Sequence, residues 1–389
     1  MTAVAACRVE RLRLHRFRAW YDDTVELGPR LTVVTGRNAQ GKTTLLEAIA
    51  TLALTRSPRT ATTSELIRWN EPTATVQARI ARPDGPVALE MRIDRSTGDR
   101  AVRRTTVDGT ERPVRDLLGI CPVVLFQPED LGLVRGSPEG RRRLLDIVLS
   151  QLDRVAAAEL VRYRRVLDQR NALLRGLRLG TSTSARAALD AFTAELVRCG
   201  AAVQVARARL TAELAPLAAS ALDELSDGGE QLGAVYAAEG LEQPVAMDAE
   251  TQAEAFGRAL RARSTEELAR GTTVLGPHRD DVVLTLDGRT ARTAGSQGQQ
   301  RSVVLALKLA EMRHLAGVAG MAPVLLLDDV LSELDAGRRD RLCAGLVAAG
   351  GQVLITTTEP GVRDLAVLGP ALRLHIDGGR SVPPPEDLP

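Results

Sequence analysis

The chain has 389 residues, 44% of them hydrophobic, and its 51 basic and 49 acidic residues leave a formal net charge of +2. A net charge this small excludes a protein that binds nucleic acid through a positive field over its whole surface. Met1 to Arg8 is too short for a signal peptide, and no apolar run approaches the roughly 20 residues that cross a bilayer, so we expect a cytoplasmic protein without membrane contact. The four cysteines show no metal-binding spacing, and we expect them to be reduced.

A glycine-rich segment near the N-terminus lies between an apolar strand and a helix. The run Leu31 to Thr35 predicts the strand, and the stretch Thr43 to Leu54 predicts the helix. The segment between them fits the pattern G-x-x-x-x-G-K-[ST] and reads Gly36-Arg37-Asn38-Ala39-Gln40-Gly41-Lys42-Thr43. Converging backbone N–H groups and a helix start favour nucleotide phosphates here, with Lys42 on the β- and γ-phosphates and Thr43 on Mg²⁺.

Lysine is rare in this chain, because only Lys42 and Lys308 are found among its 51 basic residues. An arginine fork cannot replace a compact ammonium on a flexible stem. A lysine retained at position 42 therefore favours a phosphate site over the alternative, a glycine-rich turn that precedes Lys-Thr by coincidence.

The middle of the chain changes from strands to helices. Alternating segments at 73–80, 87–93 and 102–107 predict an antiparallel sheet. From about residue 137 to 271 the sequence is rich in Ala, Leu, Arg and Glu. We expect two long helices, about 138–175 and 184–225, that form a hairpin arm, the first spanning roughly 57 Å at 1.5 Å per residue. A shorter helix is expected near 250–269.

The segment Gly276-Pro277-His278-Arg279-Asp280-Asp281 predicts a rigid turn before a strand. We interpret His278 as structural rather than catalytic.

Two further motifs follow in the C-terminal third. Ser296-Gln297-Gly298-Gln299 opens a predicted helix, about 298–317, and offers a second helix start for an anion. The apolar run from Val324 predicts a buried strand that ends in Asp328 and Asp329. We expect Asp328 to hold Mg²⁺ and Asp329 to orient or deprotonate the attacking water.

One chain thus carries two phosphate-binding helix starts, which favours a nucleotide held between two copies. The segment Ser332-Glu333-Leu334-Asp335 is then expected to touch the opposite copy.

These motifs, in this order, resemble the ABC-type ATPase heads of the SMC superfamily and, within it, the RecF family of bacterial recombinational repair. Further blocks of the chain carry the resemblance: Leu14 to Arg18, Ser57 to Thr60, Glu65 to Trp69, Phe126 to Leu131 and Gly276 to Asp281. The resemblance implies an α/β P-loop ABC/SMC-type ATPase head with an inserted α-helical arm, or lobe II. The expected head comprises 1–136 and 272–377, the arm 137–271 and a disordered tail 378–389.

The resemblance also implies a function. It implies ATP and Mg²⁺ as cofactors, Asp329 and Gln127 as catalytic residues, and an ATP-dependent homodimer in which the Ser296 to Gln299 signature acts in trans. The expected activity is weak, DNA-dependent ATP hydrolysis that serves as a switch, on DNA duplex near single-strand gaps or junctions. RecR and RecO are implied partners, in loading RecA and in SOS induction.

Two departures from transporter-type ATPases predict slow hydrolysis. Asp329 stands where those proteins carry glutamate, and Thr356-Thr357-Thr358 follows the last core strand where they carry histidine.

Arginines are the candidate DNA contacts. Arg59 resembles an SMC-type arginine loop, with an ordinary surface arginine as the alternative. Further candidates, for which solvated surface residues are the alternative, are Arg103, Arg104, Arg141, Arg142 and Arg143. Aromatic residues make up only 2% of the chain, so we expect recognition of the duplex backbone rather than stacking on unpaired bases.

Two other functions stay open at this stage. A transporter ATPase subunit would need the signature much closer to the phosphate loop, and a short SMC-like structural tether would need a longer arm.

Overall fold

The computed structural model describes residues 5–96, 100–180, 185–226, 229–358 and 368–383. The chain forms two compact units. The head unit takes the described residues of Met1–Asp130, Glu224–Asp227 and Leu307–Pro389, and the arm unit takes those of Leu131–Asp223 and Gly228–Ala306. No helix among these described residues is long and apolar enough to span a membrane.

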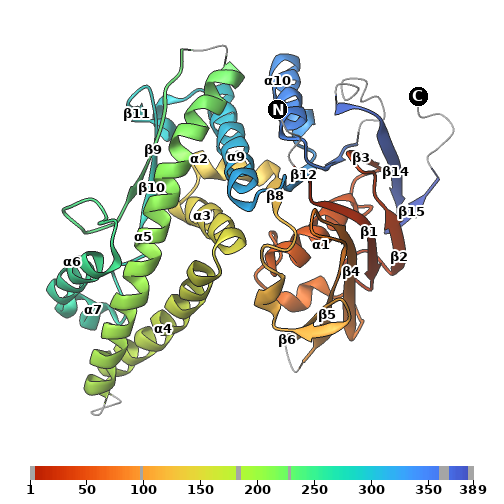
Figure 1. Ribbon diagram of the computed structural model, residues 1–389. Coiled ribbons are helices and arrows are strands. Elements are labelled where there is room, and N and C mark those ends of the chain that lie inside the picture. Colours follow the sequence, from red (N-terminus) through yellow and green to blue (C-terminus); the bar gives the residue numbers. More distant parts are fainter. Residues whose placement is uncertain (1–4, 97–99, 181–184, 227–228, 359–367, 384–389) are drawn as a thin grey trace. The chain divides into compact units, whose positions relative to one another are not determined.

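The centre of the head unit is a mostly parallel sheet with the strand order β15-β14-β3-β13-β12-β8 (Figure 1). Its strands are β3 (Leu31–Thr35), β8 (Val123–Phe126), β12 (Val324–Asp328), β13 (Val353–Thr356), β14 (Ala371–Asp377) and β15 (Arg380–Val382). Every residue of β8, β12 and β13 is buried, which explains their almost unbroken apolar sequences. The predicted strands at 31–35 and from Val324 are confirmed.

A second sheet of the head unit is antiparallel, with the order β2-β1-β4-β5-β6-β7. Its strands are β1 (Arg8–His15), β2 (Asp22–Glu26), β4 (Thr73–Ala81), β5 (Val87–Arg95), β6 (Ala101–Val107) and β7 (Thr110–Arg112). The three strands predicted between residues 73 and 107 are therefore confirmed. Alternate residues of β4 and β5 are buried, as expected of a sheet with one covered face.

Helix α1 (Lys42–Leu54) contacts strands of both sheets, and all its residues except Thr43 are buried (Figure 1). A helix that is covered on every side needs apolar residues all round, which explains why its sequence is not amphipathic. The head unit also contains α10 (Ala336–Ala349) and the second half of α9 (Gln297–Ala319). Its short 3₁₀ helices are η1 (Thr63–Leu66), η2 (Val114–Leu117), η3 (Pro128–Leu131, whose last residue lies in the arm unit) and η4 (Val330–Glu333).

The arm unit is built from helices around a small sheet. The helices are α2 (Gly132–Arg135), α3 (Pro138–Leu152), α4 (Arg154–Arg178), most of α5 (Ala185–Ser226), α6 (Ala249–Ala262), α7 (Ser264–Arg270), α8 (Ala291–Ala294) and the first half of α9. The sheet has the order β11-β10-β9, with β9 (Leu232–Ala237), β10 (Asp281–Leu286) and β11 (Arg289–Thr290).

The prediction of one helix over 138–175 is wrong. The chain leaves helical geometry at Asp153, with φ −129° and ψ 106°, and the carboxylate of Asp153 accepts hydrogen bonds from the N–H groups of Val155 and Ala156. This N-cap starts α4 as a separate helix. The helix predicted at 250–269 is likewise two helices, α6 and α7.

Two boundaries also differ from the sequence-based prediction. Residues 272–306, expected in the head, lie in the arm unit, because β10 pairs along its length with β9, a strand that was not predicted. The tail expected to be disordered from residue 378 is ordered through its first residues, because Arg380–Val382 forms β15 and pairs with β14. Residues 384–389 lie outside the described part of the chain.

Candidate nucleotide site

The candidate site lies at the carboxyl edge of the parallel sheet in the head unit. The register pairs Leu327 with Phe126 and Asp328 with Thr356, so Gln127, Asp328 and Thr356 end three adjacent strands. On the other side of β13, strand β3 leads directly into Gly36. Parallel sheets place ligands at this edge.

The phosphate loop runs from Gly36 to Thr43 and has a tightly turned backbone. Gly36, Ala39 and Gly41 all have positive φ, at 144°, 64° and 106°. A Cβ atom on Gly36 would lie 2.3 Å from the carbonyl oxygen of Ile376, so only glycine fits. Helix α1 begins at Lys42, one residue before the predicted start.

Lys42 hydrogen-bonds to its own loop. Its Nζ donates to the carbonyl oxygens of Gly36 at 2.6 Å and Arg37 at 2.9 Å. Burial lowers the pKa of this ammonium, while Asp329 and Asp328 oppose the shift. The ammonium therefore lies inside the loop, beside two carboxylates and within reach of an anion bound there.

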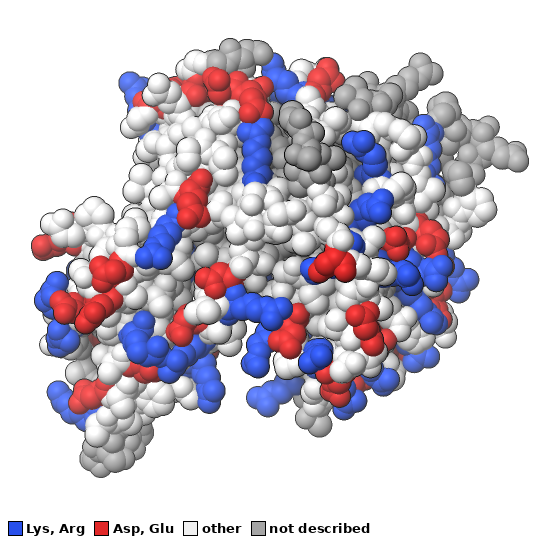
Figure 2. All heavy atoms as spheres, viewed as in Figure 1, with Lys and Arg blue, Asp and Glu red and all other residues white. Residues whose placement is uncertain are grey.

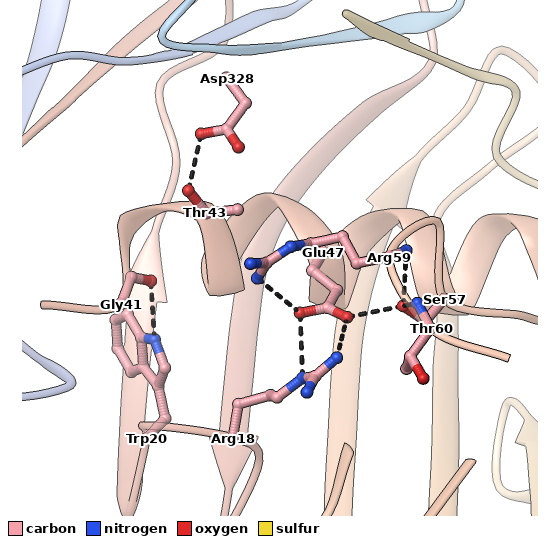
Figure 3. Close-up of polar contacts among 9 residues, drawn as sticks. All are labelled: Arg18, Trp20, Gly41, Thr43, Glu47, Ser57, Arg59, Thr60 and Asp328. Carbon is pink, nitrogen blue, oxygen red and sulfur yellow. Dashed lines mark hydrogen bonds and ion pairs between the residues drawn. The ribbon is translucent and has the colours of Figure 1, made fainter. Parts of the chain in front are cut away.

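Two distant segments hold the loop. The buried indole of Trp20 donates from Nε1 to the carbonyl of Gly41 at 3.1 Å (Figure 3). The turn between β14 and β15 also donates two backbone hydrogen bonds to Gln40, from Gly378 to Oε1 at 2.7 Å and from Gly379 to the carbonyl at 3.0 Å. Sequence reasoning missed both contacts and placed Gln40 only among the nucleotide contacts.

Asp328 and Thr43 meet as the predicted Mg²⁺ ligands should. Thr43 Oγ1 donates to Asp328 Oδ1 at 2.8 Å, and Thr356 Oγ1 donates to the same oxygen at 2.7 Å (Figure 3 shows the first contact). Burial raises the pKa of Asp328, and these two hydroxyl donors oppose the shift. The sequence showed the threonine run, yet it gave Thr356 no role.

Asp329 has an unusual backbone and an unpaired oxygen. Its φ of 52° is left-handed, a conformation that non-glycine residues adopt at a cost and often at functional sites. Among the described residues its buried Oδ1 has no hydrogen-bond partner. An unpaired oxygen beside Asp328 and Thr43 is the donor set that a hard cation and its water prefer, so these residues fit Mg²⁺.

Glu47 on α1 is the centre of a buried charge cluster behind the loop. Arg18 contacts both its carboxylate oxygens, at 2.8 and 3.2 Å, and Ser57 donates to it at 2.6 Å. Arg59, the candidate arginine-loop residue, contacts it at 3.4 Å and keeps 44% of its side chain exposed. Figure 3 shows these side chains converging on Glu47. The charge of Arg59 also opposes the rise that burial causes in the pKa of Asp328, so it acts electrostatically on the site.

The other candidate DNA arginines differ in their surroundings. Arg103 donates to the carbonyl of Thr55, and burial lowers its pKa. Arg141 makes a two-pronged ion pair with Asp281 at 2.7 and 2.9 Å, and Arg142 donates to the carbonyl of Asp280 at 2.7 Å. These three side chains are tied to their own unit.

Arg104 and Arg143 are exposed. Figure 2 shows basic and acidic residues intermixed over the visible face. Trp69 is 85% exposed. This exposed aromatic side chain was not predicted from the sequence, from which we expected no stacking on unpaired bases.

The predicted signature belongs to the arm unit, whereas the phosphate loop belongs to the head unit. Ser296 caps the start of α9: its Oγ accepts from the N–H of Gln299 at 3.3 Å, and its own N–H donates to Gln299 Oε1 at 2.7 Å. This reciprocal pair is a capping box. Ser296 and Gln297 are exposed, and Gly298 is half-buried. The predicted helix start is confirmed.

The segment after Asp329 is anchored at both ends. Ser332 Oγ donates to the carbonyl of Asp329 at 2.7 Å, and Asp335 caps α10 through the N–H of Arg338. Leu334 is buried, whereas Ser332 and Asp335 are exposed.

His278 is enclosed in the arm unit. Its Nδ1 lies 2.6 Å from the hydroxyl of Tyr163, and its Nε2 lies 3.2 Å from the carbonyl of Thr273. Burial lowers the pKa of His278 to about 4. Asp280 accepts from Gln204 and Tyr236 in the same core. These internal contacts support the structural interpretation of this segment.

Comparison with known proteins shows the family to which the chain belongs. The family model described as RecF/RecN/SMC N terminal domain matches residues 8–367. The chain is 41% identical over 389 residues to the DNA replication and repair protein RecF of Chloroflexus aurantiacus. The alignment covers 96% of this chain and 98% of that protein. Two solved structures of the recombination mediator protein RecF, described as RecF-ATPrS and RecF-ATP in the RecFOR pathway, are 28% identical, with TM-scores of 0.87 and 0.86. Each match covers 98% of this chain, and the matches cover 99% and 98% of the two solved chains, respectively. The chain therefore belongs to the RecF family of DNA replication and repair proteins, with the ATPase head of the SMC superfamily.

Proposed function

We propose that this protein is an ATP-dependent DNA-binding protein of recombinational repair and replication-fork maintenance. The observation that carries the proposal is the assembly of Lys42, Thr43 and Asp328 at one sheet edge, with Thr43 hydrogen-bonded to Asp328 at 2.8 Å. The similarity to a structure described as RecF-ATP supports ATP as the nucleotide.

Each polar group of the site has a part in ATP binding. The ammonium of Lys42 exchanges the carbonyls of Gly36 and Arg37 for the β- and γ-phosphates. Thr43 and Asp328 would hold Mg²⁺, which supplies neutralisation of phosphate charge when bound. The unpaired carboxylate oxygen of Asp329 accepts a hydrogen bond from water and orients it. Gln127, at the end of the adjacent strand, is the second polar group at this edge.

A second copy of the chain completes the site. The exposed start of α9, with Ser296 at its cap, offers N–H groups and the positive end of a helix dipole. In the proposed ATP-bound homodimer, this surface contacts the γ-phosphate held by the partner. Hydrolysis then removes the shared contact and opens the dimer.

DNA binding depends on the dimer in this proposal. The closed dimer holds duplex near single-strand gaps or junctions, and slow hydrolysis releases it. Arg59, Arg104 and Arg143 remain the candidate contacts, since they are exposed, whereas Arg103, Arg141 and Arg142 are only partly exposed. With RecO and RecR, the dimer helps to load RecA and supports SOS induction. The structure offers no observation that favours a transporter subunit or a structural tether.

Two measurements test this function. The molar mass in solution is measured with and without ATP and a gapped duplex, and we expect the dimeric mass only with ATP. Calorimetry then compares the unaltered chain with Lys42→Ala, for which we expect at least about 100-fold weaker ATP binding, because two charge-assisted contacts are lost. Unchanged affinity with an unchanged melting temperature would contradict the assignment of the phosphate loop.

A further inference from the structure

A buried charge cluster lies beside Gln127 in the head unit. Lys308 and Glu311, on α9, have side chains that are only 7% and 2% exposed, and their charged atoms are 3.1 Å apart. The ammonium of Lys308 also lies 3.7 Å from Oδ1 of Asp130, whose side chain is 18% exposed. Buried charges are retained at a cost in free energy, so this cluster calls for a reason beyond stability.

Asp130 connects the cluster to Gln127. Its second oxygen, Oδ2, accepts a hydrogen bond from the backbone N–H of Gln127 at 2.8 Å. Its own N–H donates to the carbonyl of Gln127 at 3.0 Å. The two contacts close a tight turn around Gln127, so the orientation of one carboxylate sets the backbone of that residue.

The ammonium of Lys308 favours the charged form of this carboxylate. Burial raises the pKa of Asp130, and Lys308 opposes that shift. A charged carboxylate is the stronger acceptor for a backbone N–H. Position 308 also departs from the composition of the chain, because it is one of two lysines among 51 basic residues and the other is Lys42. The compact ammonium of lysine suits a buried position between two carboxylates better than the planar guanidinium of arginine does.

The place of Lys308 in the chain links two parts of the site. It lies on α9, the helix that begins immediately after Ser296. An α-helix moves as a stiff element, so a displacement at its start is carried to residues three turns further along.

We propose that Lys308 is a positioning residue for Gln127, acting through Asp130, and that it couples the signature helix to the catalytic edge of the sheet. This inference rests on the proposed ATPase function and deepens it. Engagement of Ser296 by nucleotide shifts α9, and Lys308 then carries Asp130 and the backbone of Gln127 into the arrangement that supports hydrolysis.

Three variants test the coupling. Lys308→Met removes the charge at nearly the same length, and Asp130→Ala removes the acceptor for Gln127. Arg313→Met is the matched control, because it removes a positive charge from the same helix, where Arg313 pairs with Glu224 at 2.5 Å. ATP affinity is measured by calorimetry and the hydrolysis rate in single turnover.

We expect Lys308→Met and Asp130→Ala each to slow hydrolysis by about 10-fold to 100-fold, as misplacement of a catalytic group does. ATP affinity stays within about twofold, because Lys42, Thr43 and Asp328 are untouched. The double variant is no slower than the slower single variant, because both act through one contact. Arg313→Met hydrolyses ATP at the unaltered rate.

A folded Lys308→Met variant with the unaltered rate would overturn the inference, as would multiplicative losses in the double variant. A purely structural role predicts a lower melting temperature with binding and hydrolysis reduced together, which also counts against it. If Lys308→Met does not fold, Asp130→Ala decides on its own. Failure of the unaltered chain to bind or hydrolyse ATP would instead contradict the proposed function, so the two failures can be told apart.

Discussion

Asp329 is the residue whose surroundings bear most directly on the proposed hydrolysis. It follows the buried strand β12 in a left-handed conformation, and its Oδ1 is buried without a partner among the described residues. Asp328, its neighbour, is occupied by the hydroxyls of Thr43 and Thr356. The proposed function accordingly gives Asp328 the cation and Asp329 the water.

This division predicts the effect of Asp329→Asn. The variant should bind ATP with nearly unchanged affinity and hydrolyse it about 100-fold or more slowly, because the water loses its charged acceptor while Asp328 is untouched. Dimers should accumulate on DNA. The rate is measured in single turnover with enzyme in excess, and hydrolysis by Asp329→Asn at the unaltered rate would remove this residue from the mechanism.

His278 provides a residue-scale test that is independent of nucleotide. Burial, with smaller contributions from Arg279 and Arg142, lowers its pKa to about 4 from an ordinary value of 6.5. Because the unfolded chain then binds the proton more readily, stability falls as the pH drops from 6.5 towards 4. The loss is at most about 3 kcal/mol.

We therefore expect His278→Gln to flatten the pH dependence of the free energy of unfolding in this window. Urea unfolding at several pH values measures it. The same substitution at His15, on the antiparallel sheet, serves as the control. Equal slopes for His278→Gln and the unaltered chain would show that folding does not lower the pKa of His278.

At the scale of elements, the phosphate loop depends on segments far from it in the chain. Trp20, before β2, donates to Gly41, and the turn between β14 and β15 donates to Gln40. The loop is thus held by two other segments of the head unit. Changes in the loop on nucleotide binding should reach Trp20 directly.

Trp20 can report those changes, because the chain has only one other tryptophan, the exposed Trp69. In Trp69→Phe, all tryptophan emission comes from Trp20. We expect the emission to change on addition of ATP with Mg²⁺, with a midpoint that matches the calorimetric affinity. The double variant with Lys42→Ala should show no change, and a silent Trp20 at saturating ATP would mean that the loop keeps its geometry.

Regular elements of the head unit could be predicted because their apolar patterns have the period of the structure they form. The run from Leu31 and the segment at 73–80 became β3 and β4 with boundaries that differ by one residue at most. The break between two helices at Asp153 could not be predicted, because helical composition continues on both sides of it. The break depends on one capping side chain, that of Asp153. Strand β9 could not be predicted either, because it is short and gains its stability from pairing with β10. The first residues of the two strands, Leu232 and Asp281, are 49 positions apart in the chain.

The candidate site divides in the same way. Lys42, Thr43, Asp328 and the Ser296 cap follow local motifs and could be read from the sequence. Thr356, the Arg18 contact with Glu47 and the Lys308 contact with Asp130 join residues that are far apart in the chain. Such contacts have no local signature, because the fold alone brings their partners together.

At the scale of the whole molecule, the central claim is a nucleotide site shared between two copies. The phosphate loop belongs to the head unit and the exposed Ser296 cap to the arm unit. In the proposed dimer, each ATP contacts the loop of one copy and the α9 start of the other. An altered Ser296 then leaves the loop of its own chain intact.

Mixing two inactive variants tests this claim most directly. Lys42→Ala keeps the Ser296 surface, and Ser296→Arg keeps the phosphate loop but blocks closure with a bulky side chain. We expect neither variant to hydrolyse ATP alone. A mixed dimer rebuilds one of its two sites, so about half of the unaltered activity per mixed dimer should return if the sites act independently.

The measurement is ATP hydrolysis as a function of the mixing ratio, with mixed dimers quantified by molar mass. The shared-site account predicts a maximum near equal amounts of the two variants and none in either pure sample. If mixed dimers form and no activity returns, or if Ser296→Arg alone dimerises with ATP as the unaltered chain does, the site is not shared and the account is contradicted.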